Sequence, residues 1–188
     1  MTWIRTVAPG EADGALAQTL DAIASARGGV AAVHLAQSLN PRALAAHLEL
    51  YKAVVFARSS LSRVARERIA VVVSAANRCD YCVSHHGAAL DNLGEDIATS
   101  DPLRSGNIPA SLPEVDRAML KWAKRSAAQP WTASAEDIAE LRSAGLDDRA
   151  ILDAALVTAY FCFVNRLVLM LGVDTEADFA RFCRDGSE

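Results

Sequence analysis

Residues 66–90 read RERIAVVVSAANRCDYCVSHHGAAL and decide how the rest of the chain is interpreted. This stretch holds two cysteines three residues apart, Cys79 and Cys82, followed by the histidine pair His85 and His86. On a helix, which turns by about 100° per residue, Cys79, Cys82 and His86 fall within an arc of roughly 60°, whereas His85 points away. The spacing therefore predicts one helix face that carries two thiols and one imidazole.

This combination of side chains indicates thiol chemistry. A Cys-x-x-Cys pair at the start of a helix closes reversibly to a disulfide, and the positive end of the helix favours the attacking thiolate. His86 follows Cys82 by four residues, so its ring is a neighbour of that sulfur. A proton acceptor beside a nucleophile is the general arrangement of covalent catalysis.

A lone acid, Glu67, lies twelve residues before Cys79, and residues 77–78 form a candidate break between two helices. If the helices fold back as a hairpin, Glu67 and His86 lie about 15 Å and about 10 Å from the turn along the helix axes. Two long side chains can close that offset. A carboxylate in that place would orient the imidazole and raise its basicity.

An alternative interpretation leaves Glu67 as a solvated helix charge. Nearby arginines fit such a wet face: Arg63, Arg66 and Arg68. An exposed pair four residues apart would add only about 0.3 kcal/mol to stability. From the residues alone, both interpretations of Glu67 remain open.

The spacing E-x11-C-x2-C-x3-H resembles the signature of the alkylhydroperoxidase D family, part of the carboxymuconolactone decarboxylase-like superfamily. The wording of residues 67–86 is more similar still to the branch of peroxidase-related enzymes, and AYFCFVNRLVLMLGV at residues 159–173 also resembles that branch. The resemblance covers roughly residues 60–173. It implies an all-α helical bundle in which the Cys-x-x-Cys pair starts a helix of a helical hairpin.

Carried over by position, the resemblance implies a thiol-dependent peroxidase. Cys82 would attack the hydroperoxide and Cys79 would resolve the product to a disulfide. Glu67 and His86 would form the proton relay. It further implies an external thiol reductant, of lipoyl or thioredoxin-like type, and a homo-oligomer, a trimer or hexamer.

The sequence departs from that family at Tyr81, since the best-described members have a histidine just before the second cysteine. A phenol with a pKa near 10 does not take up protons at neutral pH as an imidazole does. Tyr81 and His85 are therefore candidates for supporting roles only.

Other functions stay open. One is a decarboxylase or isomerase of the wider superfamily that acts on a small carboxylic acid, although such relatives typically lack the Cys-x-x-Cys pair. Another is a non-catalytic helical module that senses redox state or binds metal. Structural zinc sites usually draw ligands from two chain segments, and His85 faces elsewhere on its helix, so we expect no bound metal and no cofactor.

Length, composition and charge limit the classes of protein to which the chain can belong. With 188 residues, 52% hydrophobic and 22% charged, the chain is expected to be one soluble domain over residues 1–188. Its formal charge of -4 argues against nucleic-acid binding and against an anionic membrane surface. Residues 1–10 show no secretory signal, and the cysteine spacing is no disulfide framework, so we expect a cytoplasmic protein.

Helical periodicity and end signals recur along the whole chain. We expect N-terminal helices within residues 11–58 and a motif core from about 60 to 173. Helices are predicted at these ranges: 11–27, 30–39, 41–58, 113–128, 134–145 and 147–171, with a short one from residue 174. Residues 100–113, rich in proline and glycine, predict a loop.

Several end signals and single residues carry their own expectations. Ser62 should cap the helix with Glu67, and Ser134 with Asp137 should form a capping box. The apolar run at 150–172 is interrupted by polar residues, which indicates a buried helix and not a membrane span. The remaining histidines and cysteines are expected to be structural or inert: His34, His47, Cys162 and Cys183.

Overall fold

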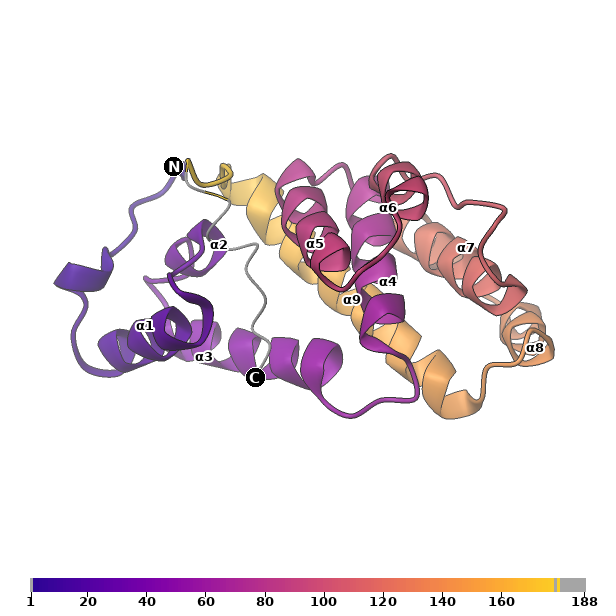
Figure 1. Cartoon of the computed structure of the whole chain (residues 1–188). Coiled ribbons are helices and arrows are strands. Elements are labelled where there is room, and N and C mark those ends of the chain that lie inside the picture. The colour runs from indigo at the N-terminus through magenta and orange to yellow at the C-terminus, as the bar shows by residue number, and fades with distance from the viewer. Residues whose placement is uncertain (1, 178, 180–188) are drawn as a thin grey trace.

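The computed structural model describes residues 2–177 and 179, and this part of the chain is helical without a strand (Figure 1). The fold class predicted from the sequence is thus confirmed. The helical elements follow one another along the chain: η1 (Pro9–Glu11), α1 (Gly14–Arg27), α2 (Ala32–Leu35), α3 (Pro41–Tyr51), η2 (Lys52–Phe56), α4 (Arg63–Ala76), α5 (Asp80–Asn92), α6 (Ile97–Arg104), α7 (Glu114–Ala128), η3 (Pro130–Thr132), α8 (Ala135–Ser143) and α9 (Asp148–Leu171).

Helix α4 lies at the centre and packs against α5, α6, α7 and α9 (Figure 1). Residues 69–73 are all fully buried, so this helix has neighbours on every side in its middle turns. Its three consecutive valines have modest helix propensity, and burial of their side chains outweighs that cost. The helix begins as predicted, with the Ser62 hydroxyl accepting from the Ala65 N–H at 3.1 Å.

A tight turn joins α4 to α5 and sets the cysteines in place. Asn77 ends α4, and Arg78 then adopts a left-handed conformation with φ of 57°. A non-glycine residue there costs about 1–2 kcal/mol, so the turn is strained and must be held by its surroundings. Cys79 is the N-cap of α5, and its N–H donates to the Ser74 carbonyl at 2.9 Å. The predicted hairpin is therefore present.

Among the described helices, α9 is the one that is long and apolar enough to cross a membrane by length and composition. The same properties occur in core helices of soluble proteins. One face of α9 is buried against the rest of the bundle, and Phe161 is fully buried. The other face exposes large apolar side chains: Leu152, Leu156, Phe163, Leu169 and Met170.

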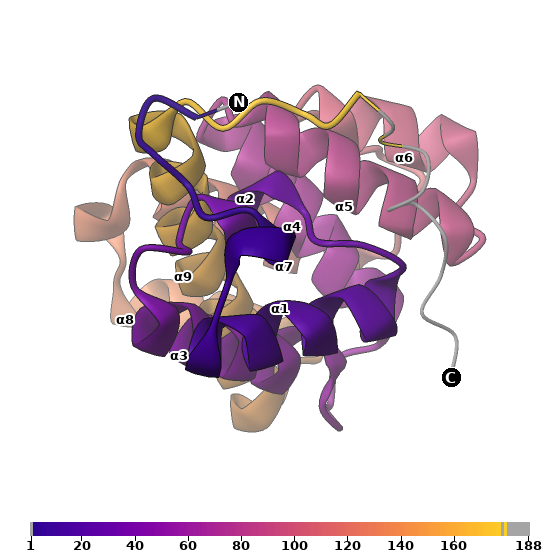
Figure 2. The same ribbon diagram turned by 90° about the vertical axis from the view of Figure 1, so that its left-hand side faces the viewer.

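The N-terminal helices form a second packed layer, which faces the viewer in Figure 2, where α1 runs across the front of the molecule beside α3. Their small core is separate from the main core around α4 and consists of Leu16, Leu20, Ile23, Val30, Leu44 and Leu48. The described residues thus form two apolar clusters, and the candidate site lies on the side of α5 that faces the N-terminal helices.

Three predicted elements differ in the structure. The helix expected at 30–39 is only α2, and the helix expected at 41–58 ends as α3 and continues as the π-helical turn η2. The loop expected at 100–113 contains most of α6, because Asp96 caps that helix and Leu103 is buried despite Pro102.

The chain end also departs from expectation. Residues 173–176 are not helical, although a short helix was predicted from residue 174. The rest of that predicted helix, at 178 and 180–188 with Cys183, lies outside the described residues.

Candidate active site

The two motif cysteines are free thiols at the start of α5. Cys79 is fully buried at the N-cap position, whereas Cys82, in the first turn, lines a cavity. Both sulfurs therefore lie at the positive end of the helix dipole, which favours a thiolate. Only one of them, that of Cys82, is shown on the wall of the cavity.

The two thiols titrate as a pair. The hydrogen bond from the Cys82 thiol lowers the pKa of Cys79. The same hydrogen bond, together with burial and the charge on Cys79, raises the pKa of Cys82. The Cys82 proton must therefore be removed before that sulfur can attack.

Glu67 and His86 meet across the hairpin. The Glu67 carboxylate is completely buried, and its Oε2 atom lies 2.7 Å from His86 Nδ1. Arg63 Nε donates to the other carboxylate oxygen at 3.1 Å. The interpretation of Glu67 as a solvated charge is therefore wrong.

These contacts determine the charge of Glu67 and the tautomer of His86. Burial alone would raise the pKa of Glu67, but the charges and hydrogen bonds of His86 and Arg63 outweigh it, so the pKa is lowered. With its Nδ1–H donated to a carboxylate, the neutral imidazole carries its lone pair on Nε2. The arrangement holds a proton acceptor one helical turn after Cys82.

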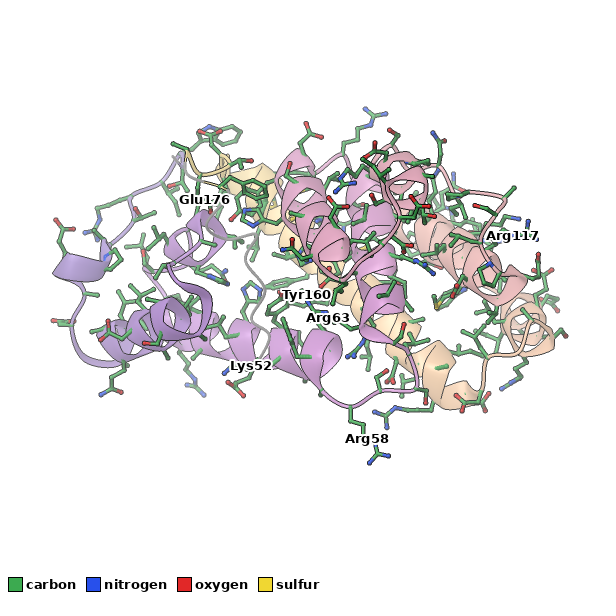
Figure 3. The ribbon with its side chains drawn as sticks, viewed as in Figure 1. Lys52, Arg58, Arg63, Arg117, Tyr160 and Glu176 are labelled. Carbon is green, nitrogen blue, oxygen red and sulfur yellow. The ribbon has the colours of Figure 1, made fainter. Side chains whose placement is uncertain are left out.

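A second carboxylate, Glu176, which the sequence did not point to, lies against the same helix. It follows α9 and reaches His85 Nε2 at 2.9 Å with one oxygen. The other oxygen accepts from the Tyr81 hydroxyl at 2.9 Å and from the Ala32 N–H at 2.6 Å. Figure 3 labels Glu176 close to the start of α2. Glu176 thus links the chain end, α2 and α5.

The contacts of Glu176 also determine the protonation states of Glu176 and Tyr81. Burial would raise the pKa of Glu176, but the hydrogen bonds from His85 and the Ala32 N–H lower it to about 2. The pKa of Tyr81 is strongly raised, by burial first and then by the charge on Glu176. Tyr81 therefore stays a neutral hydrogen-bond donor at any ordinary pH.

Three neighbouring side chains also bear on the site. His85, which lies outside the arc of the two thiols and His86 on the helix, lines the same cavity as Cys82. Arg66 and Arg68, which fit a wet face in the alternative interpretation of Glu67, are buried or nearly so. Arg66 donates to the Ala57 carbonyl at 2.9 Å, at the end of the π-helical turn, and Arg68 pairs with Glu95 and with Asp116.

The cavity beside Cys82 has a volume of about 760 Å³. Its opposite wall comes from α1, α2, α3 and α9 and includes His34, His47 and Tyr160, whose hydroxyl lies 2.7 Å from His47 Nε2. Figure 3 shows Tyr160 and Arg63 in the middle of the molecule. His34 and His47 are buried as expected of structural histidines, but they also line the cavity.

Known proteins share part of this sequence and the whole fold. The model of the carboxymuconolactone decarboxylase family matches residues 41–125. A peroxidase-related protein from Silicibacter sp. TM1040 is 30% identical, with a TM-score of 0.83, over 97% of this chain and 96% of that chain. The chain belongs to the alkylhydroperoxidase D-like branch of the carboxymuconolactone decarboxylase superfamily.

Other solved structures share the architecture. The alkylhydroperoxidase core of a peroxidase-related protein from Ralstonia eutropha JMP134 is 26% identical, with a TM-score of 0.87, over 98% of this chain and 97% of that chain. A debrominase in complex with 2,3,4-tribromopyrrole has the same fold, with a TM-score of 0.73 at 20% identity, over 86% of each chain. No curated protein matches.

Some residues of the site lie inside the range that matches the family model, and one lies outside it. The dithiol, His86 and Glu67 lie inside the matched residues 41–125, and so do Tyr81 and His85. Glu176 lies outside this range. Among the described residues, no group of three or more histidine, cysteine or acidic side chains is arranged to hold a metal ion.

Proposed function

We propose that this chain is a thiol-dependent peroxidase that reduces organic hydroperoxides with the Cys79/Cys82 dithiol. The observation that carries the proposal is the 2.7 Å contact between Glu67 and His86, one helical turn after a thiol on a cavity wall. A base held by a buried carboxylate beside a nucleophile on a cavity wall is the arrangement this chemistry needs. Superfamily membership supports a peroxidase-related activity.

In the proposed reaction, His86 Nε2 takes the proton of Cys82 and the sulfur attacks the terminal peroxide oxygen. The O–O bond breaks, and the alkoxide leaves as an alcohol with the proton from His86. Cys82 is now a sulfenic acid. The Cys79 sulfur attacks it, hydroxide leaves and takes up a proton as water, and a disulfide forms. One hydroperoxide and two thiols yield alcohol, water and disulfide.

The two cysteines receive different roles from exposure and from charge. Cys82 lines the cavity, so it is the sulfur that a peroxide can reach. Cys79 is buried behind it and has the lowered pKa, which suits a resolving thiolate that attacks only its neighbour. A lower pKa at Cys79 is therefore compatible with attack at Cys82.

The disulfide must be reduced by an external thiol. Because both sulfurs are buried, a narrow group such as a lipoyl arm suits the cavity better than the face of a folded thioredoxin-like protein. We place the protein in the cytoplasm, as a single domain over residues 1–188. The exposed apolar side chains of α9 fit burial in a homo-oligomer, a trimer or hexamer.

The experiment that tests the proposal is steady-state consumption of cumene hydroperoxide with dithiothreitol as reductant. Activity should vanish in Cys82→Ser, because serine cannot form the sulfenic acid. Cys162→Ser is the matched control: this free cysteine is half-buried and lies outside the cavity lining, so activity should persist. Full activity of Cys82→Ser would overturn the mechanism.

A titration of free thiols separates the proposal from the other candidates. A peroxidase loses two thiols on addition of peroxide, and dithiothreitol restores them. A decarboxylase or isomerase of the superfamily turns over its acid substrate without that loss. A metal-binding module would be purified with metal bound to its thiols and would not consume peroxide catalytically.

A further inference from the structure

Asn165 is a fully buried amide in the apolar helix α9, next to the α4–α5 turn. Its Oδ1 accepts from Asn77 Nδ2 at 3.0 Å, and its Nδ2 donates to Ser74 Oγ at 3.0 Å. Burying an amide costs free energy unless its hydrogen bonds are made, and these contacts orient the group. The network assigns the NH2 group to the side of Ser74.

Both partners of Asn165 lie at the end of α4, just before the turn that presents the dithiol. Ser74 accepts the Cys79 N–H with its backbone carbonyl, and Asn77 is the C-cap of α4. Arg78, the next residue, has the strained φ of 57°. A strained residue persists only when its surroundings hold it. Asn165 holds the chain just before Arg78, and its partner Ser74 is hydrogen-bonded to Cys79, just after Arg78.

The same amide is linked to the dithiol through Ser74, whose hydroxyl accepts the Asn165 N–H and whose carbonyl accepts the Cys79 N–H. A hydrogen bond from Asn165 lowers the pKa of Cys79 and of Cys82, although other effects dominate at each thiol. A hydrogen bond from an N–H to a thiolate is stronger than one to a neutral thiol, because the acceptor is charged. Only reduced, deprotonated sulfur gains that stabilisation.

We infer that Asn165 is a positioning residue of the dithiol: it holds the strained turn and directs an N–H at the sulfur pair, which favours the reduced thiolate over the disulfide. This inference rests on the proposed redox function. Stabilising the reduced form makes a dithiol a stronger oxidant. Asn165 would thus keep the resting enzyme reduced and ready for peroxide.

The test replaces the donor while keeping the size of the side chain. In Asn165→Asp the NH2 group becomes a carboxylate oxygen, so thiolate is disfavoured. Iodoacetamide should alkylate the reduced variant at pH 7 at least tenfold more slowly than the wild type. In equilibrium with glutathione and glutathione disulfide, the constant should shift about tenfold toward the protein disulfide, which is about 30 mV.

Two further variants keep the test decisive. Asn165→Leu has no donor and no charge, and it should shift both readouts in the same direction by a smaller factor. Thr158→Val is the control, since Thr158 is buried two turns earlier on α9 and bonds only the Ala154 carbonyl of its own helix. Circular dichroism and thermal melting identify variants that fold.

The outcomes distinguish this inference from the proposed function. Wild-type alkylation rates and redox equilibrium in folded Asn165→Asp and Asn165→Leu would overturn it. Equal shifts in Thr158→Val would also overturn it, because packing alone would then explain them. Neither readout uses peroxide turnover, so the effect of Asn165 on the thiols can be established even if Cys82→Ser removes the peroxidase proposal.

Discussion

The two consecutive histidines of α5 each contact a carboxylate, but they reach it in different ways. His86 uses Nδ1 to contact Glu67, on the neighbouring helix of the hairpin. His85 uses Nε2 to contact Glu176, which lies 91 residues further along the chain. When neutral, the two rings therefore carry their lone pairs on opposite nitrogens. The same kind of histidine–carboxylate contact thus makes His86 a base beside the thiol, whereas it makes His85 part of a structural link.

The surroundings of the two carboxylates differ as well. Glu67 is fully buried, and its carboxylate accepts hydrogen bonds from both His86 and Arg63. Glu176 is partly buried and is held by a hydroxyl and a backbone N–H in addition to His85. Removing the first carboxylate changes the basicity of a ring beside the nucleophile. Removing the second loosens the joint between the chain end, α2 and α5.

The largest expected effect comes from Glu67→Gln compared with Glu176→Gln. Glu67→Gln should lower kcat/KM for cumene hydroperoxide by about 100-fold or more, the scale of a general-base contribution, because His86 loses its carboxylate. Glu176→Gln, a matched change beside the adjacent histidine, should lower it by less than about tenfold. Steady-state assays of both variants over pH 5–9 measure the difference.

If the two variants lose activity equally, the Glu67–His86 pair and the Glu176–His85 pair do not differ in function as proposed. The pH profile adds a second criterion, since only Glu67→Gln should shift the limb that reports loss of the Cys82 proton. A shift of that limb in Glu176→Gln would make His85 and Glu176 a second proton relay.

The predictable part of the site is the part encoded by local spacing. The face shared by the Cys-x-x-Cys pair and His86 and the turn at 77–78 follow from the rise and rotation of two adjacent helices. The residues alone left Glu67 either inward or solvated, and the family resemblance implied the inward position that the structure shows. Local cap signals also identified Ser62 and the box of Ser134 with Asp137, both of which the structure confirms.

The unpredicted part depends on contacts between distant segments. Glu176 is set among ordinary polar residues, so no spacing rule joins it to His85. Asn165 appears in the sequence only as a polar interruption of an apolar helix. Its place beside the dithiol follows from the packing of α9 against α4. The burial of Arg66 and Arg68 is not readable from the sequence for the same reason, since the groups that accept their hydrogen bonds come from other elements.

A medium effect is expected in acid stability. The pKa of Glu176 in the folded protein is about 2, below its ordinary value of 4.5. Its contribution is therefore fully present above about pH 4.5 and is lost as pH falls toward 2. Glu176→Gln should lower the free energy of unfolding by about 1–3 kcal/mol at pH 7, and by much less near pH 2. Urea titrations at pH 7, 4 and 3 measure this.

Glu49→Gln serves as the control for that stability measurement. Glu49 forms an exposed pair with Lys52, so its removal should change the free energy of unfolding by about 0.5 kcal/mol or less at every pH. If Glu176→Gln behaves like Glu49→Gln, the carboxylate does not link the chain end to α5.

The smallest effect is expected from Tyr81→Phe, which removes only the hydroxyl that donates to Glu176 at 2.9 Å and accepts from the Val33 N–H at 3.3 Å. The free energy of unfolding should fall by about 1 kcal/mol. Because burial and the charge on Glu176 keep the phenol protonated, kcat/KM should stay within about threefold and its pH profile should not move. The double variant with Glu176→Gln should be little less stable than Glu176→Gln alone, since the two groups share one hydrogen bond. A tenfold loss of activity in Tyr81→Phe would instead place the hydroxyl in the proton path of Cys82, at the position where the best-described relatives have a histidine.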